Sequence, residues 1–256
     1  MPAQIHQFPC LDDNYGVLVH DPATGATASI DAPEAGPVLA ALAQTGWTLT
    51  DILVTHHHKD HIGGIEGVKA KFPQARVVAP AADRERIPGA DVYLHEGEEA
   101  KVGALTARVV ETPGHTSGHI VYHFADEKLL FAGDTLFAMG CGRAFEAPAQ
   151  TLHASVQKLA GLPDDTQIYC GHEYTQSNGR FALKVDPDNA ALKARMEEVD
   201  RLRADGKPTL PTTMGLERAT NPFLRVDDPG VRRAVGLPDA PAADVFAELR
   251  ERKNKG

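Results

Sequence analysis

Short apolar runs alternate with polar stretches rich in Gly, Pro and Asp through the first two thirds of the chain. Seven runs rich in β-branched residues predict strands, and these cover residues 15–20, 51–55, 76–78, 106–111, 119–124, 128–132 and 167–170. Apolar residues at helical spacing predict helices at 37–44 and 149–160. Strands and helices mixed in this way predict a layered α/β fold.

The pattern changes after residue 172. A charged helix is predicted at 189–204, Gly206-Lys207-Pro208 ends it, and a segment rich in Pro and Arg leads to a last helix at 242–253. A chain of 256 residues is long enough for one large domain and a smaller one. We therefore expect a first domain at 1–172 and a mainly α-helical second domain at 173–256.

The composition is that of an ordinary globular protein, with 42% hydrophobic and 24% charged residues. No apolar run approaches the ~20 residues that span a bilayer, and the first ten residues lack the features of a secretory signal. The three cysteines, Cys10, Cys141 and Cys170, do not form a closed set of disulfides. Reduced thiols of this kind favour a cytoplasmic location.

The net charge of −9, without a block of Lys and Arg, argues against nucleic acid as the main partner. We expect a monomer that acts on a small molecule and has no membrane partner. An acidic protein that binds an anionic small molecule needs a local basic cluster.

His or Asp follows four of the predicted strands. The strand at 51–55 leads into His56-His57-His58-Lys59-Asp60-His61, and the other three lead into Gly114-His115, Gly133-Asp134 and Gly171-His172. In layered α/β folds the loops after strand ends converge on one cleft, and the glycines before His115, Asp134 and His172 permit sharp turns. The four strand ends therefore predict a single site.

The donor types at these strand ends predict a dinuclear metal site. Imidazole suits zinc and iron(II), and carboxylate is tolerated by zinc, iron and manganese. Seven donors are too many for one tetrahedral ion, but they suit two ions about 3.5–4 Å apart. The predicted ligands are His56, His58 and His115 on one ion, and Asp60, His61 and His172 on the other, with Asp134 bridging. Zinc is preferred, with iron or manganese as alternatives, and Asp60 and Asp134 are the predicted catalytic carboxylates.

Each donor taken alone has a structural alternative. A lone histidine after a strand is usually a surface or capping residue, and Asp134 could be a turn residue or a helix N-cap. Asp60 could equally cap a helix that begins at His61. The combined motif with its three ordered partners outweighs these alternatives. His57 is predicted to be structural, because adjacent residues in an extended turn point in opposite directions.

The motif Thr55-His56-His57-His58-Lys59-Asp60-His61-Ile62-Gly63-Gly64 resembles the signature of the metallo-β-lactamase superfamily, and His115, Asp134 and His172 fit its remaining ligand positions. This resemblance implies an αββα sandwich with the site at its edge, and an Asp31 that supports the metal loop. Further motifs resemble the glyoxalase II (hydroxyacylglutathione hydrolase) family across nearly the whole chain. They are Asp13-Asn14-Tyr15, Gly140-Cys141-Gly142-Arg143, Gly171-His172-Glu173-Tyr174-Thr175, Asn221-Pro222-Phe223-Leu224-Arg225 and Arg250-x-x-Lys253.

The resemblance implies hydrolysis of S-D-lactoylglutathione to glutathione and D-lactate. A water bridging two metals has its pKa lowered towards about 7, which provides hydroxide at neutral pH. The residues implied to hold glutathione are Arg143, Phe145, Tyr174, Arg250 and Lys253. Phe145 stands where some members have a tyrosine, so only its backbone amide is expected to contribute. For Arg250 and Lys253 the alternative is a solvated helix end, where cations are favoured by the helix dipole.

Two other functions remain open at this point. A persulfide dioxygenase of the same superfamily also acts on a glutathione derivative, but it uses a single iron held by two histidines and an aspartate. The presence of Asp60, His61 and His172 favours the dinuclear hydrolase. A non-catalytic binding protein is disfavoured by the complete ligand set.

Overall fold

The computed structural model of the chain describes residues 1–256 and divides into two compact units. The first unit contains Met1–Glu111 and Ser117–Gly133, and the second contains Thr112–Thr116 and Asp134–Gly256. The chain therefore passes from one unit to the other three times. The domain boundary expected at residue 172 stays a prediction.

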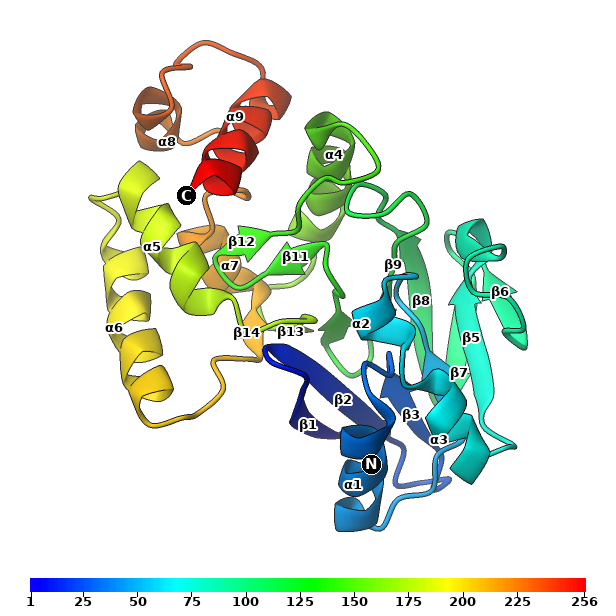
Figure 1. Cartoon of the computed structure of the whole chain (residues 1–256). Helices are drawn as coiled ribbons and strands as arrows, with labels where there is room; N and C mark the ends of the chain where they lie inside the picture. The colour runs from blue at the N-terminus through cyan, green and yellow to red at the C-terminus, as the bar shows by residue number, and fades with distance from the viewer. The chain divides into compact units, whose positions relative to one another are not determined.

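A six-stranded sheet forms one layer of the first unit (Figure 1). Its order is β1 (Gln4–Cys10), β2 (Asn14–His20), β3 (Thr27–Ile30), β4 (Asp51–Leu53), β5 (Arg76–Pro80) and β6 (Val92–Leu94). Strands β1 to β3 are antiparallel, and β3 to β6 run parallel. Helices α1 (Ala35–Thr45) and α3 (Ile65–Lys71) cover one face, where Leu42 and Val68 pack with Ile52 in a continuous apolar core.

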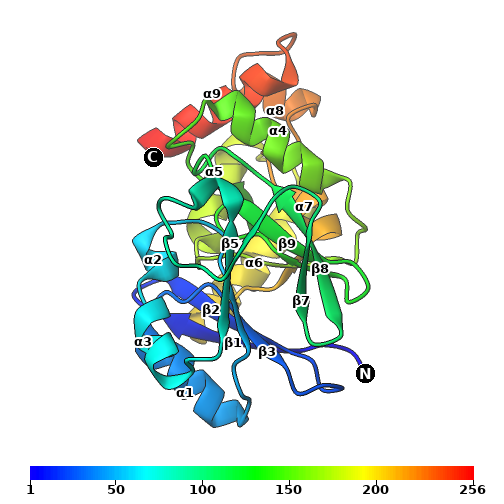
Figure 2. The same ribbon diagram turned by 90° about the vertical axis from the view of Figure 1, so that its right-hand side faces the viewer.

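Four antiparallel strands of the first unit form a second layer, most of which is seen in Figure 2. They are β7 (Glu99–Val102), β8 (Leu105–Glu111), β9 (Ile120–Phe124) and β10 (Leu129–Phe131). The buried Tyr122 hydroxyl donates to the carbonyl of Val54 at 2.8 Å, and the Ile120 amide donates to the carbonyl of Thr55 at 2.9 Å. These bonds fix the end of the β4 segment immediately before the His-rich motif.

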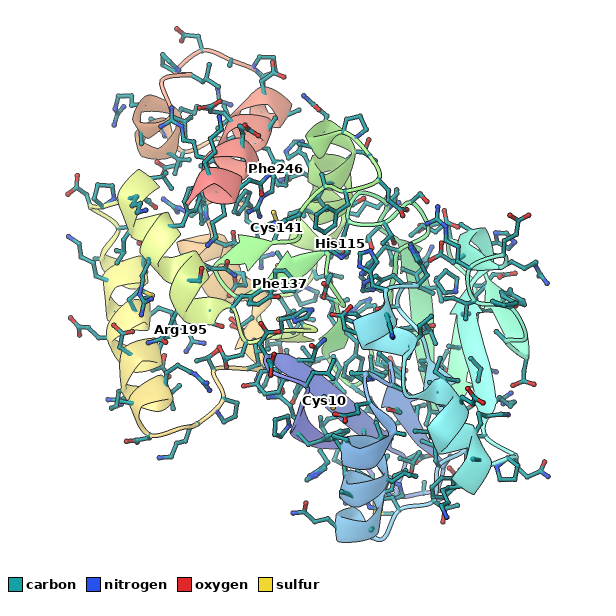
Figure 3. All side chains as sticks on the ribbon, viewed as in Figure 1. Cys10, His115, Phe137, Cys141, Arg195 and Phe246 are labelled. Carbon is teal, nitrogen blue, oxygen red and sulfur yellow. The ribbon has the colours of Figure 1, made fainter.

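The second unit is mainly helical. Its helices are α4 (Ala149–Ala160), α5 (Thr175–Val185), α6 (Ala190–Ala204), α7 (Met214–Thr220), α8 (Pro229–Ala234) and α9 (Ala242–Lys255). Its short strands are β11 (Leu136–Phe137) paired with β12 (Gly140–Cys141), and β13 (Gln167–Tyr169) paired with β14 (Thr212–Thr213). Helices α4 and α9 lie side by side in both ribbon views (Figures 1 and 2). The fully buried Phe246 of α9 (Figure 3) packs against Phe223, and the two ring centroids are 5.2 Å apart.

All seven predicted strands and all four predicted helices are present, with ends shifted by at most two residues. The sequence pattern missed the shortest elements, such as α2 (Lys59–Ile62), β11 and β12, and it also missed the longer β1 and α5. No helix of residues 1–256 combines the length and the apolar character needed to cross a membrane.

Candidate metal centre and adjoining cavity

The His-rich motif lies in the first unit, where it occupies the loop after β4 and the short helix α2. His56 is fully buried, and its Nε2 lies 3.2 Å from Nδ1 of His58. Nitrogen and oxygen ligands lie 2.0–2.2 Å from zinc, which places two ligands of a tetrahedral ion about 3.3–3.6 Å apart. The facing nitrogens of His56 and His58 are therefore spaced closely enough to share one ion.

Asp31 supports this loop, as the resemblance implies. It follows β3 with φ of 56°, a left-handed conformation that is uncommon for a residue other than glycine. Its Oδ1 accepts from the Thr55 amide at 2.7 Å, and its Oδ2 lies 2.7 Å from Nδ1 of His61. When His61 Nδ1 donates its proton to this carboxylate, Nε2 keeps the lone pair that binds a metal.

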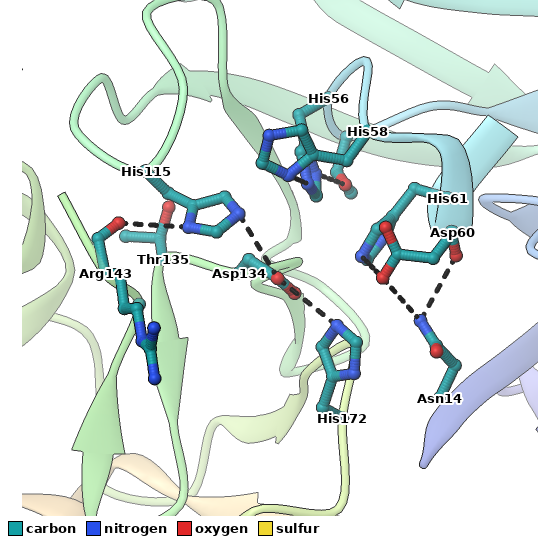
Figure 4. Close-up of polar contacts among 12 residues, drawn as sticks. Asn14, His56, His58, Asp60, His61, His115, Asp134, Thr135, Arg143 and His172 are labelled. Atoms are coloured by element: carbon teal, nitrogen blue, oxygen red, sulfur yellow. Dashed lines mark hydrogen bonds and ion pairs between the residues drawn. The ribbon is translucent and has the colours of Figure 1, made fainter. Parts of the chain in front are cut away.

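Two contacts orient the remaining residues of the motif. Asn14 of β2 donates through Nδ2 to Oδ2 of Asp60 at 3.2 Å and to its carbonyl at 3.1 Å (Figure 4). The motif containing Asn14 is visible in the sequence, but nothing there links it to Asp60. His57 lies with Nδ1 3.2 Å from Oδ2 of the fully buried Asp83, which agrees with the structural role predicted for this histidine.

His115, Asp134 and His172 lie in the second unit, and all three are buried. Oδ2 of Asp134 lies 3.4 Å from Nε2 of His115 and 3.3 Å from Nε2 of His172 (Figure 4). Each of these two distances is close to that between two ligands of one ion. His115 Nδ1 lies 3.0 Å from the carbonyl of Arg143, so a proton donated there leaves Nε2 as the metal-facing nitrogen.

Two aromatic side chains pack near His172. The Tyr174 ring lies parallel to the imidazole, with centroids 4.7 Å apart and 4° between the planes. Phe137 meets the Tyr174 ring edge-on at 5.4 Å.

The conformational freedom of glycine matters before His115 and Asp134, because the preceding residues Gly114 and Gly133 adopt φ of 148° and 48°.

A cavity of about 490 Å³ in the second unit is lined by the residues predicted to hold the substrate. Its walls include Arg143, Phe145, Tyr174, Arg250 and Lys253, together with the predicted ligands His115 and Asp134. Phe137 and Cys141, from the two strands of the β11–β12 hairpin, also line it (Figure 3). The exposed Phe145 ring lies 5.2 Å from the His115 ring, at the junction of the two predicted sites.

Cations gather around this cavity although the whole chain is acidic. The half-buried Lys253 has its pKa lowered to about 8, first because burial penalises the charged amine and then because Arg250, Lys184 and Arg143 repel it. Lys253 Nζ donates to the carbonyl of Ser177 at 3.1 Å and to its Oγ at 2.8 Å. Several cations forced together in this way attract an anionic ligand.

The turn between β11 and β12 is held by buried polar side chains that sequence reasoning did not single out by role. Asn221 donates through Nδ2 to the carbonyls of Phe137 at 3.2 Å and Gly140 at 2.9 Å. The Met139 amide donates to the carboxylate of Glu217 at 2.7 Å. Burial raises the pKa of Glu217, while its hydrogen bonds oppose that shift. The hairpin that separates Asp134 from Arg143 is therefore fixed at its tip.

Comparisons with known proteins agree with this picture. The model for the "Metallo-beta-lactamase superfamily" matches residues 11–172, and the model for the "Hydroxyacylglutathione hydrolase C-terminus" matches residues 173–256. A curated hydroxyacylglutathione hydrolase of Rhodopseudomonas palustris (strain ATCC BAA-98 / CGA009) is 61% identical over 256 residues, which cover 100% of each chain. The chain belongs to the hydroxyacylglutathione hydrolase family.

Solved structures of lower identity share the fold. The crystal structure of ETHE1 from Myxococcus xanthus is 27% identical with a TM-score of 0.66, and the match covers 99% of each chain. The crystal structure of TTHA1623 in a di-iron-bound form is 25% identical with a TM-score of 0.61, covering 86% of this chain and all of that one. The predicted metallo-β-lactamase fold with a helical carboxyl-terminal domain is confirmed, and the donor set is that of a divalent-metal site.

Proposed function

We propose that the chain hydrolyses the thioester of S-(2-hydroxyacyl)glutathione, typically S-D-lactoylglutathione, to glutathione and D-lactate, a step in methylglyoxal detoxification. The observation that carries this proposal is the cavity in which the predicted metal ligands His115 and Asp134 adjoin the predicted anchors Arg143 and Lys253. The relatives of high identity, which are named hydroxyacylglutathione hydrolase, support the same reaction.

Two divalent ions, with zinc preferred and iron or manganese as alternatives, belong to the proposal. The proposed ligands are His56, His58 and His115 for one ion, and Asp60, His61 and His172 for the other, with Asp134 bridging. The ligand spacings within each unit support this assignment, as does the di-iron form of one solved relative. When bound, such a pair supplies a hydroxide at neutral pH and polarises the thioester carbonyl.

The side chains hold and orient the reacting groups. Asp134 and Asp60 are the proposed catalytic carboxylates: Asp134 fixes the spacing of its two histidine partners, and Asn14 holds Asp60 in position. Thiolate departure needs little help from an acid, because the ordinary pKa of a thiol is about 8.5.

The substrate anchors of the proposal are Arg143, Phe145, Tyr174, Arg250 and Lys253, all of which line the cavity. Glutathione carries carboxylates, and each charged hydrogen bond to one of them contributes about 1.5–3 kcal/mol. Phe145 lacks a phenolic hydroxyl, so its contribution is limited to its backbone amide and its apolar ring.

The alternative of a mononuclear iron persulfide dioxygenase is less well supported. It leaves four of the seven donors without a metal to bind, and the carboxyl-terminal family model is that of the hydrolase. A cytoplasmic, monomeric enzyme without nucleic-acid or membrane partners completes the proposal. Burial of the unpaired Cys10 and Cys141 raises their pKa values to about 12 and about 11, which keeps these thiols unreactive.

The deciding experiment measures hydrolysis of S-D-lactoylglutathione through the decrease in thioester absorbance. The metal content of the same sample is quantified in parallel. We expect thioester cleavage without oxygen uptake and two divalent ions per chain. One iron per chain, with oxygen uptake on glutathione persulfide and no thioester cleavage, would establish the dioxygenase instead.

A further inference from the structure

Arg250 of α9 is a buried cation whose side chain is occupied by protein contacts. The residue is only 5% exposed, and its guanidinium carbon lies 5.3 Å from the centre of the Phe223 ring. Nη1 donates to the carbonyl of Cys141 at 2.8 Å and approaches that of Gly142 at 3.4 Å, while Nε donates to Oδ1 of Asn254 at 3.1 Å. Hydrogen bonds from a buried guanidinium are stronger than those at the surface, because the surroundings screen them less.

The next carbonyl along the chain contacts a predicted metal ligand. The carbonyl of Arg143 lies 3.0 Å from Nδ1 of His115, whose Nε2 faces Asp134. Three successive carbonyls, those of residues 141, 142 and 143, are therefore engaged by Arg250 at one end and His115 at the other. A shift of residues 141–143 would displace the Arg143 carbonyl, the hydrogen-bond acceptor that sets the orientation of the His115 imidazole.

The segment has no free space in which to absorb such a shift. A Cβ atom at Gly142 would lie 2.0 Å from the carbonyl oxygen of Asp134 and 3.3 Å from Nδ1 of His115. The Gly142 amide also donates to the carbonyl of Thr135 at 3.2 Å. The backbone thus packs directly against both predicted ligands, and close packing transmits small displacements.

We propose that Arg250 is a positioning residue for the metal site, acting through the carbonyls of residues 141–143 on the imidazole of His115. The inference rests on the proposed function, since it takes His115 to be a metal ligand. It adds a role for Arg250 that does not depend on contact with glutathione. Partners of metal-binding histidines typically contribute 10- to 100-fold to metal affinity, and Arg250 acts one step further away.

The test measures Co²⁺ binding to the metal-free full-length chain and the visible absorption of the Co²⁺ form. Arg250→Met keeps much of the side-chain volume but removes the charge and the donors. We expect its Co²⁺ dissociation constant to rise about tenfold, at the lower end of the range for such partners, with a changed absorption spectrum. Arg250→Lys retains one donor group and should lie between the wild type and Arg250→Met.

Arg252→Met is the matched control. Arg252 is on the same helix and likewise donates to two successive carbonyls, those of Ala234 at 3.0 Å and Val235 at 2.7 Å. Its substitution removes bonds from α9 to the same number of carbonyls without touching residues 141–143, so Co²⁺ affinity should stay at the wild-type value. An equal loss in Arg252→Met would assign the effect to general weakening of α9 and overturn the proposal.

A double substitution tests the route. In a His115→Gln background the additional effect of Arg250→Met on Co²⁺ affinity should fall below about twofold, because the imidazole that Arg250 positions is gone. An undiminished effect would show that Arg250 acts elsewhere. Wild-type Co²⁺ affinity and spectrum in Arg250→Lys and Arg250→Met, with only KM raised, would make Arg250 solely a substrate anchor. A wild-type chain that binds no Co²⁺ would overturn the proposed function along with this inference.

Discussion

The ring of Tyr174 lies parallel to the imidazole of His172, with only 4° between their planes. This stacking limits the rotation of a predicted metal ligand, and it requires the ring but not the hydroxyl. Aromatic pairs of this kind contribute about 0.5–1.5 kcal/mol beyond their buried area.

The first prediction separates these two parts of Tyr174. Tyr174→Phe should retain metal affinity, while Tyr174→Ala should weaken it by roughly 2- to 12-fold, the equivalent of 0.5–1.5 kcal/mol. Equilibrium dialysis against a competing chelator measures the difference. If the two variants lose metal equally, the hydroxyl is what holds His172, and the stacking has no role.

The second prediction concerns Asp134, whose Oδ2 faces two imidazoles. Asp134→Ala should lower kcat/KM by at least about 100-fold, because loss of a mere supporting partner already costs 10- to 100-fold in such sites. Metal content should fall while circular dichroism shows a folded chain. Wild-type turnover with full metal content would exclude a bridging role.

The third prediction tests recognition of the glutathione moiety by Arg143. Arg143→Ala should reduce kcat/KM for S-D-lactoylglutathione by about 10- to 150-fold, since a charged hydrogen bond contributes about 1.5–3 kcal/mol. A thioester that lacks the glycyl carboxylate should lose much less. Equal losses on both substrates would mean that Arg143 serves the β12 segment rather than the ligand.

The fourth prediction follows from the pKa of Lys253, which is lowered to about 8. As pH rises from 7 to 9 the amine loses its charge, so KM should rise several-fold through this range while kcat changes less. Lys253→Met should have a higher KM that varies little over the same interval. A pH profile of KM that is identical in the two proteins would exclude Lys253 as an anchor.

The same group has an opposite effect on stability. Its pKa is lower in the folded chain than the ordinary value of 10.5, so between about pH 8 and 10.5 the unfolded chain binds more protons. Lys253 alone therefore makes the folded state relatively more stable as pH rises through that window. Denaturant unfolding of wild type and Lys253→Met across this range would measure the difference.

Most of the longer elements and the candidate donors could be recognised in the sequence for a common reason. An apolar run followed by a glycine and then a histidine or aspartate is a local pattern, and Gly133-Asp134 illustrates it with a glycine at φ of 48°. Strands of two residues, such as β11 and β12, lack enough periodicity to be recognised. The strand β1 was missed because Gln4, Gln7 and Pro9 interrupt its apolar pattern.

Hydrogen bonds between residues that are far apart in the sequence could not be predicted. Asn14 and Asp60 are 46 residues apart, and Arg250 lies 109 residues from Cys141. No local pattern indicates that such residues will meet, because the pairing depends on how strands and helices pack. The family resemblance implied the same role for Arg250 and Lys253, yet they use their donors differently: Arg250 bonds to Cys141 and Asn254, and Lys253 bonds to Ser177.

The path of the chain through its two units has a consequence for biosynthesis. The first unit is complete once Gly133 has been made, but His115 and Asp134 belong to the second unit, which ends at Gly256. A nascent chain halted before residue 250 would already carry all seven predicted donors. It would still lack the guanidinium of Arg250, which contacts the carbonyls of residues 141 and 142. Ribosomal synthesis therefore supplies all the predicted ligands well before α9, the helix whose Arg250 positions His115.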